Sequence, residues 1–428
     1  MVSLIDRFPL EITELIVESL APPRYIPYTD SDDEDSENEP EDAIAQYKGL
    51  KALALTCHTL LHICRKHLFF SVGLHSDKEF TRFVQIIARS PALAQFIRCL
   101  YYWPKASVSA LPSLVEALQS LTQLKYLTLN GGDLLSIPNS LRDAILHLTH
   151  LPTIEYLGLS DVENIIPHLL VSCSNVKHLL VSSRGFSRFL GDDLPTIITK
   201  PTQPRTIFID DFGSEVLLSM LKARDSRGTS MMNFDNLRRC TVFTFNEEPS
   251  HLRSELYGLI SYVTCLEDLE VCGSPESLVS DALYAIASNT KALKILKVEA
   301  RIRDDPLTAI CAALGNIAGR NPIETLTVEI IDCDHIVCCN NVALDGGYKL
   351  LENVLLQPGW KHLQYFKLRF TIWPRTTDRH GSSNLPRSMK QELASRIKGQ
   401  IEPNFQRLAT KKSFKFEYRI RDYQRYLW

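Results

Sequence analysis

One spacing of apolar residues recurs along most of this chain: the second follows the first by three positions, and the third follows the second by two. Successive copies start 22 to 40 residues apart, except for one interval of 61 residues that holds a weaker apolar stretch at Ile207–Ile209. A unit of this size cannot bury its apolar face alone, so the period predicts an array of stacked repeats. The nine copies are Ile97-Leu100-Tyr102, Leu124-Leu127-Leu129, Ile154-Leu157-Leu159, Val176-Leu179-Val181, Leu237-Cys240-Val242, Leu266-Leu269-Val271, Leu293-Leu296-Val298, Ile323-Leu326-Val328 and Leu363-Phe366-Leu368.

Each copy predicts a short strand. Its second and third apolar residues lie two positions apart and point to one face of a strand, and amphipathic stretches of helical spacing lie between the copies. Strands joined through helices pair in parallel. The pattern resembles a leucine-rich-repeat array, which implies an α/β solenoid with parallel strands on its concave face and helices outside. That family usually has Asn or Cys eight residues after each start; here the position holds Lys105, Gly132 and Val162 in the first three copies, so we expect irregular repeats.

Residues 1–74 show a different, helical pattern. Pro9 suits the first position of a helix, and the apolar residues Ile12, Leu15, Ile16 and Leu20 follow at helical spacing. A second apolar series runs from residue 50 to residue 68, where Thr56 is a candidate N-cap. Helices this short cannot bury a sufficient core alone, so the segment is expected to bind a partner surface.

The N-terminal residues that carry a family resemblance are Phe8-Pro9-Leu10-Glu11-Ile12 and Leu53-Ala54-Leu55-Thr56-Cys57 with Leu60 and Leu61. They resemble an F-box, and the arrangement is most similar to fungal F-box proteins. The resemblance implies a small all-α module that binds a Skp-type adaptor and, through it, a cullin ubiquitin ligase. The implied adaptor contacts, some of which must instead pack the helices together, are Pro9, Leu10, Ile12, Leu15, Ile16, Leu53, Leu55, Leu60 and Leu61. The alternative is a helical cap on a larger fold.

An acidic insertion interrupts this module. Residues 30–42 hold nine carboxylates, and prolines occur at Pro22, Pro23, Pro27 and Pro40. Such a run repels itself and offers little apolar surface to bury, so residues 21–47 are predicted to be disordered.

The repeat array is expected to span residues 75–428. Alternation of Phe414, Phe416, Tyr418 and Ile420 with charged residues predicts a half-buried strand within a C-terminal cap at about residues 405–428. We expect a target protein to contact exposed strand positions of the array. The candidates are Lys125, Tyr126, Lys177, His178, Glu267, Asp268, Lys294 and Lys297.

Composition and motifs narrow the class of function. The longest uncharged run, residues 306–319, is too short to span a bilayer, and the first residues lack the apolar segment of a signal peptide. The eleven cysteines lie mostly at apolar positions, which is typical of buried thiols in a reducing compartment. We therefore expect a cytoplasmic or nuclear protein with no membrane partner.

The sequence contains no nucleophile elbow, dinucleotide fingerprint, phosphate loop or His-Glu-x-x-His motif, so neither an enzyme nor a cofactor is expected. Two clusters were considered as metal sites. In Cys57-His58-His62-Cys64-His67 the cysteines are expected to pack in the helical core, and Asp332-Cys333-Asp334-His335 with Cys338-Cys339 matches no familiar zinc spacing, so no metal is expected. The basic residues near the C-terminus are attributed to the solvated face of a strand, and nucleic acid is not an expected partner.

The leading hypothesis is therefore a substrate-receptor subunit of an SCF-type ubiquitin ligase. A leucine-rich-repeat scaffold or regulatory protein that recruits no ligase is the alternative, and a hydrolytic or metal enzyme built on the repeat loops is a third possibility.

Overall fold

The computed structural model describes residues 9–21, 40–104, 112–171, 173–183, 189–190, 200–244, 259, 262–273, 290–302, 306–320, 322–332, 344–372, 395, 397–399, 401–411 and 415–422. The chain divides into two compact units. Unit 1 comprises Met1–Leu180, Arg184–Thr202 and Ala223–Met231, and unit 2 comprises Val181–Ser183, Gln203–Lys222 and Met232–Trp428. The N-terminal helices belong to unit 1, so the compact units do not divide at the boundary between residues 74 and 75 that the sequence pattern suggested.

A parallel β-sheet of twelve strands confirms the predicted α/β class, and the strand order follows the chain from β1 to β12. This order is typical of a fold in which each strand stacks on the one before it in sequence. The strands are β1 Ser71–Leu74, β2 Cys99–Tyr102, β3 Tyr126–Asn130, β4 Tyr156–Ser160, β5 His178–Ser182, β6 Thr206–Asp210, β7 Arg239–Thr244, β8 Asp268–Gly273, β9 Ile295–Ile302, β10 Thr325–Asp332, β11 Tyr365–Ile372 and β12 Lys415–Asp422.

The apolar triplets set the register of the sheet. Each of the nine copies supplies a strand, and the middle residues pair directly, as in Leu100 with Leu127 and Leu127 with Leu157. All 27 residues of the nine copies are at most 5% exposed, so the triplets form the core. The weaker stretch in the long interval forms β6, as predicted.

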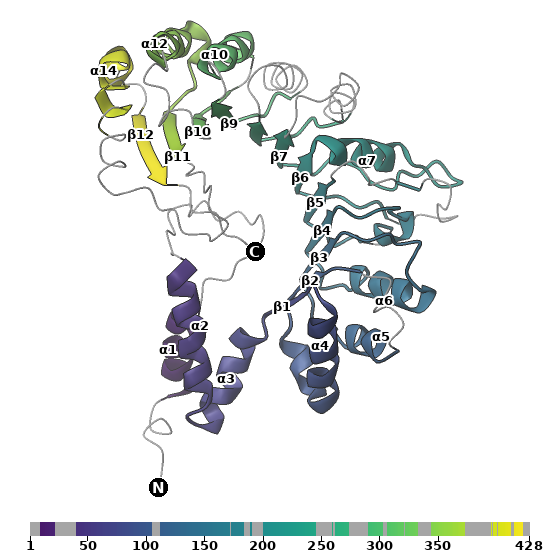
Figure 1. Ribbon diagram of the computed structural model, residues 1–428. Helices are drawn as coiled ribbons and strands as arrows, with labels where there is room; N and C mark the ends of the chain where they lie inside the picture. Colours follow the sequence, from purple (N-terminus) through teal and green to yellow (C-terminus); the bar gives the residue numbers. More distant parts are fainter. Residues whose placement is uncertain are drawn as a thin grey trace. The chain divides into compact units, whose positions relative to one another are not determined.

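Helices cover one face of the strands within each unit (Figure 1). We call the opposite face the strand face. The described helices that follow the first strand in unit 1 are α4 Asp77–Arg89, η2 Pro91–Phe96, α5 Pro112–Gln119, α6 Asn139–Thr149 and η3 Pro167–Leu169. Those described in unit 2 are α7 Asp211–Lys222, α10 Pro306–Ile317, α12 Leu344–Leu355, η5 Pro358–Trp360 and α14 Gln406–Thr410. Helix α4 shows how sequence defines a start: the backbone N–H of Glu79 donates to Ser76 Oγ, and that of Ser76 donates to the Glu79 carboxylate.

In the described part of the chain, three helices precede the sheet: α1 Leu10–Leu20, α2 Pro40–Ala54 and α3 His58–Leu68. Two predictions need correction. Helix α2 begins at Pro40, inside the segment expected to be disordered, because proline suits the first helical position and acidic residues favour the first turn. The sheet begins at Ser71, before the boundary expected at residue 75. Phe8 and residues 22–39 of the predicted insertion lie outside the described residues.

The predicted C-terminal cap contains α14 and β12, and its last residues, 423–428, lie outside the described part of the chain. Strand β12 pairs in parallel with β11 over eight residues, so this segment extends the same sheet. Phe416 and Tyr418 are half-buried. In the part of the chain that the structure describes, no helix is both long enough and apolar enough to cross a membrane.

Candidate protein-binding surfaces

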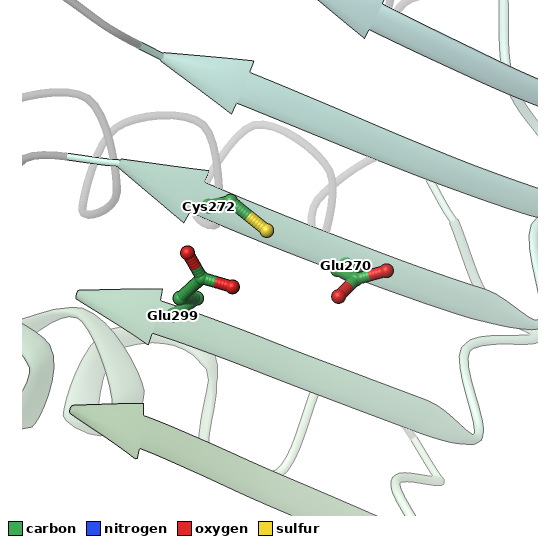
Figure 2. Close-up of side chains that lie close together, drawn as sticks. All are labelled: Glu270, Cys272 and Glu299. Atoms are coloured by element: carbon green, nitrogen blue, oxygen red, sulfur yellow. The ribbon is translucent and has the colours of Figure 1, made fainter. Parts of the chain in front are cut away.

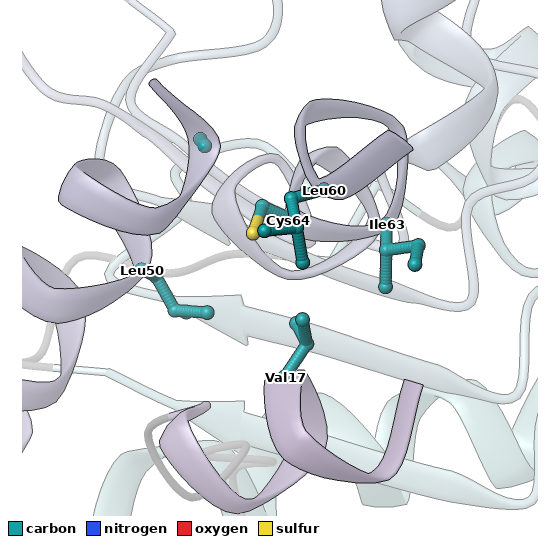
Figure 3. Close-up of a cluster of buried hydrophobic side chains, with 6 residues drawn as sticks. Val17, Leu50, Leu60, Ile63 and Cys64 are labelled. Atoms are coloured by element: carbon teal, nitrogen blue, oxygen red, sulfur yellow. The ribbon is translucent and has the colours of Figure 1, made fainter. Parts of the chain in front are cut away.

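The three N-terminal helices enclose a small core of their own. Val17 of α1, Leu50 of α2 and Leu60, Ile63 and Cys64 of α3 converge, and each is at most 3% exposed (Figure 3). Ala54 completes this set, and Leu53, Cys57, Leu61 and Leu68 pack around it while remaining partly exposed. The module is therefore held together by residues of all three helices.

Helix α1 turns a second apolar surface toward solvent. Its buried residues are Thr13 and Val17, so the face that carries the regularly spaced apolar residues is the exposed one. We call this surface the α1 patch; it comprises Leu10, Ile12, Leu15, Ile16 and Leu20, with exposed fractions of 54, 42, 59, 45 and 37%. Leu55, in the turn after α2, is 87% exposed. Contiguous exposed apolar residues on one helix mark a protein-interaction site more often than scattered ones do.

The nine adaptor contacts that the F-box resemblance implied differ in how exposed they are. Leu10, Ile12, Leu15, Ile16 and Leu55 are exposed, and Pro9 is exposed beside them. Leu53 and Leu61 are half-buried against the module core, and Leu60 lies within that core. Periodicity could not separate these groups, because both a core and a partner select apolar residues at the same helical spacing.

Polar contacts fix the helices of the module. Glu14 of α1 and Lys66 of α3 form an ion pair of 2.9 Å that links the two helices. The N-cap of α3 is Cys57, not Thr56: the backbone N–H of Leu60 donates to Cys57 Sγ at 3.5 Å, whereas the Thr56 hydroxyl donates to the Leu53 carbonyl. Thr56 does not cap α3 because its hydroxyl donates to a backbone carbonyl at the end of α2.

Among the described residues, the Cys and His side chains of this module do not gather into a group with the geometry of a metal site. Cys64 is buried in the module core, Cys57 caps α3, and the ring of His62 packs edge-on against Phe96 at 5.9 Å. Asp332 ends β10, while residues 333–339 of the second candidate cluster lie outside the described residues.

The predicted target-binding residues of unit 1 lie at the start of strands. Glu155 stands between two lysines, 3.6 Å from Lys125 and 3.2 Å from Lys177. Partial burial opposes ionisation of Glu155, but the hydrogen bond and charge of Lys177, with the charge of Lys125, lower the pKa of Glu155 below its ordinary value. Tyr126 is half-buried, with its ring 6.4 Å from that of Tyr156, and His178 is half-buried on β5.

The corresponding residues of unit 2 are tied into ion pairs. Glu267 lies 3.0 Å from Arg238, and Asp268 lies 2.6 Å from Arg239. Lys294 is exposed at the start of the next strand, and its backbone carbonyl accepts from Glu324. These pairs are partly solvated, so they set the electrostatic pattern of the surface more than its stability.

Lys297 is the centre of a charged cluster on the strand face. Its ammonium lies 2.6 Å from Glu270 of β8 and 3.7 Å from Glu329 of β10. Arg369 of β11 approaches Glu329 at 4.0 Å, and the hydroxyl of Thr371 donates to Glu329 at 2.7 Å. Four neighbouring strands therefore share one network of ion pairs.

Glu270, Cys272 and Glu299 lie at one side of this network, with one ligand-type atom from each within 4.8 Å of the others (Figure 2). Burial raises the pKa of the Cys272 thiol well above its ordinary value, and repulsion from Glu270 and Glu299 adds to the effect. Burial and repulsion from Glu329 also raise the pKa of Glu299. Glu270 is paired with Lys297, so this group of three side chains is continuous with the ion-pair network.

The other described cysteines form no disulfide, and most of them are buried. Burial raises the pKa of Cys99 to about 11 and the pKa values of Cys173 and Cys240 to about 12. These three side chains consequently remain protonated at neutral pH and are poor nucleophiles.

No protein-family model matches this chain, and its comparison with curated proteins finds no match. Function is therefore inferred from the surfaces of the described residues. The α1 patch is the largest group of exposed large apolar side chains on any one described helix or strand.

Proposed function

We propose that this protein is the substrate-receptor subunit of an SCF-type ubiquitin ligase. In this role the N-terminal helices are an F-box that binds a Skp-type adaptor, and the following units are irregular leucine-rich repeats that hold a target protein. The α1 patch carries the proposal, because five large apolar residues are exposed on a module whose core is already closed by Val17, Leu50 and Leu60.

Burial of the α1 patch in a complex would stabilise that complex. Fully burying one Leu or Ile side chain stabilises a complex by roughly 1.5–3 kcal/mol, so burying the half-exposed side chains of the patch contributes about 1 kcal/mol each. The patch combined with Leu55 then supplies enough for a specific helical contact, while Glu14 and Lys66 hold α1 against α3. Val17, Leu50 and Leu60 already hold the three helices together, so the patch is not part of this core.

The receptor would carry no catalytic residue. Its contribution is proximity, since a target held beside the charged conjugating enzyme experiences a raised effective concentration of the reactive group. The predicted target contacts remain the strand positions from Lys125 to Lys297, and the working compartment is the cytoplasm or nucleus.

Co-purification of the full chain with a Skp-type adaptor tests this function. Leu15→Asp and Ile16→Asp should each lower adaptor binding more than tenfold without loss of helicity, because both side chains are exposed. Glu18→Gln, at another exposed position of α1, is the matched control and should bind normally. If the wild-type chain fails to bind the adaptor, the ligase role is lost and the scaffold alternative takes its place.

A further inference from the structure

The outer edge of β12 is the longest strand edge in the described sheet that has no neighbouring described strand. Strand β12 is last in the order and pairs with β11 from Lys415 to Asp422, whereas β1, at the other end, has only four residues (Figure 1). The Lys415 backbone N–H donates to the Gln364 carbonyl, on the β11 side. Because backbone groups alternate in a parallel ladder, those of Phe416, Tyr418 and Ile420 face away from β11.

This edge is held in an extended form by its packing. The Phe416 ring stacks on Phe366 at 5.5 Å and on Phe405 at 5.0 Å, and the Tyr418 hydroxyl donates to Glu402 at 3.2 Å. A preformed strand lowers the entropic cost of pairing with another chain. A strand edge without a neighbouring strand can bind an extended peptide through main-chain hydrogen bonds.

The basic side chains beside the outer edge of β12 favour an acidic binding partner. On the strand face of β11 and β12, the charged side chains among the described residues are the basic Lys367, Arg369, Lys415 and Arg419 and the acidic Glu417, and Arg369 already approaches Glu329 of β10. Glu417 is paired with Arg419, and Lys415 is exposed, with its ammonium 5.9 Å from the centre of the Tyr365 ring. On β8, by contrast, Asp268 pairs with Arg239 and Glu270 pairs with Lys297.

We propose that the outer edge of β12 binds an extended acidic segment of a partner protein as an added parallel or antiparallel strand. Acidic side chains of that segment lie on the strand face beside Lys415 and Arg419, and its alternate apolar side chains continue the rows of Phe416 and Tyr418. This inference deepens the proposed function by giving the chemistry of the target. Ubiquitination of the bound protein depends on the proposed function, whereas binding of the segment to β12 does not.

The probe is a fluorescent eight-residue peptide that alternates valine and glutamate, with a lysine-for-glutamate peptide as control. Binding to the full chain, without adaptor, is measured by fluorescence anisotropy. We expect the glutamate peptide alone to bind, and Lys415→Glu combined with Arg419→Glu to weaken it at least tenfold. Equal binding of the lysine peptide would overturn the charge argument. Because no adaptor is present, this result is independent of the adaptor test.

Hydrogen exchange separates strand addition from simple charge attraction. The bound peptide should slow exchange of the outward amides of Tyr418 and Ile420, which a peptide held by side chains alone would leave unchanged. Ile420→Pro removes one outward N–H and should abolish binding, whereas Ile420→Val should retain it; circular dichroism checks that both fold. Unchanged exchange on peptide binding, or protection of these amides in a homodimer that the peptide does not displace, overturns the proposal.

Discussion

Glu352 Oε1 in α12 lies 2.9 Å from the backbone nitrogen of Arg407, 55 residues later in the chain, and 3.1 Å from that of Leu408. A carboxylate that is 4% exposed thus satisfies the first free N–H groups of α14. Helix α14 has no cap from its own N-cap residue, Phe405. The last described helix consequently depends on the helix before it for its start.

Glu352→Ala should destabilise unit 2 by about 1–3 kcal/mol, because it leaves two backbone donors unsatisfied. Urea unfolding and hydrogen exchange at Arg407 and Leu408 measure the loss. Asn353→Ala is the control: the Asn353 side chain is exposed and accepts a hydrogen bond from the Arg407 guanidinium, so about 0.5 kcal/mol or less is expected. Equal effects of the two variants would refute the capping role.

Leu60→Ala and Leu55→Ala remove the same atoms from a buried and an exposed position. Leu60 is 2% exposed and Leu55 is 87% exposed. The first removes a core side chain of the N-terminal module and should cost about 2–5 kcal/mol, while the second should cost less than about 0.5 kcal/mol. Thermal unfolding of the full chain measures both. Under the proposed function Leu55→Ala should nonetheless weaken adaptor binding, which separates the folding surface from the binding surface. Similar melting temperatures for the two variants would contradict the burial of Leu60.

Two helical glycines should respond to alanine with opposite signs. In α7, an added Cβ at Gly213 would overlap the Val181 carbonyl oxygen and lie 2.9 Å from its carbon, so Gly213→Ala should destabilise by about 1–3 kcal/mol or more. In α10, no atom lies within 4 Å of a Cβ at Gly315, and Gly315→Ala should stabilise by about 0.5–1 kcal/mol. Chemical denaturation compares them; a stabilising Gly213→Ala would exclude this close approach.

Glu299 and Glu417 should give opposite pH dependences. Burial, then repulsion from Glu329, raises the pKa of Glu299, with Glu270 adding to the rise and Lys297 and the Cys272 thiol opposing it. The folded state then binds this proton more tightly than the unfolded state, so Glu299 lowers stability as pH rises above the ordinary carboxyl value of 4.5. Glu299→Gln should therefore raise the melting temperature at neutral pH more than at acid pH.

For Glu417, the hydrogen bond from Arg419 lowers the pKa against partial burial, with the charges of Arg419, Lys367 and Lys415 assisting. Ionised Glu417 then contributes stability that is present above 4.5 and lost as pH falls. Glu417→Gln should accordingly lower the melting temperature at neutral pH, and the difference should shrink in acid. Melting curves that shift in the same direction for both variants would disprove these assignments.

Most of the fold could be predicted from the sequence because every residue of the apolar triplets is buried. Leu100, Leu127 and Leu157 had to face one core, and their spacing fixed strand and register together. The strand β1 was missed although Phe69, Val72 and Leu74 share the triplet spacing, because this segment follows directly on the apolar pattern of α3.

The candidate sites were less predictable. In α1 the sequence placed Ile12, Leu15 and Ile16 on one face, but periodicity does not say whether a core or a partner covers that face. The narrower side with Thr13 and Val17 packs inward instead. Ion pairs between strands, such as Glu270 with Lys297, follow from register and could be found only after the strands were aligned.

The paired register of the strands has a consequence for how such a protein changes over time. Intervals between triplets range from 22 to 61 residues while the aligned apolar positions stay buried, so insertions are tolerated in the connections and excluded from the strands. A single added residue within β9 would turn Leu296 outward and Lys297 inward. Binding to a different partner can therefore arise by substitution of outward-facing side chains one at a time, while the buried residues stay the same.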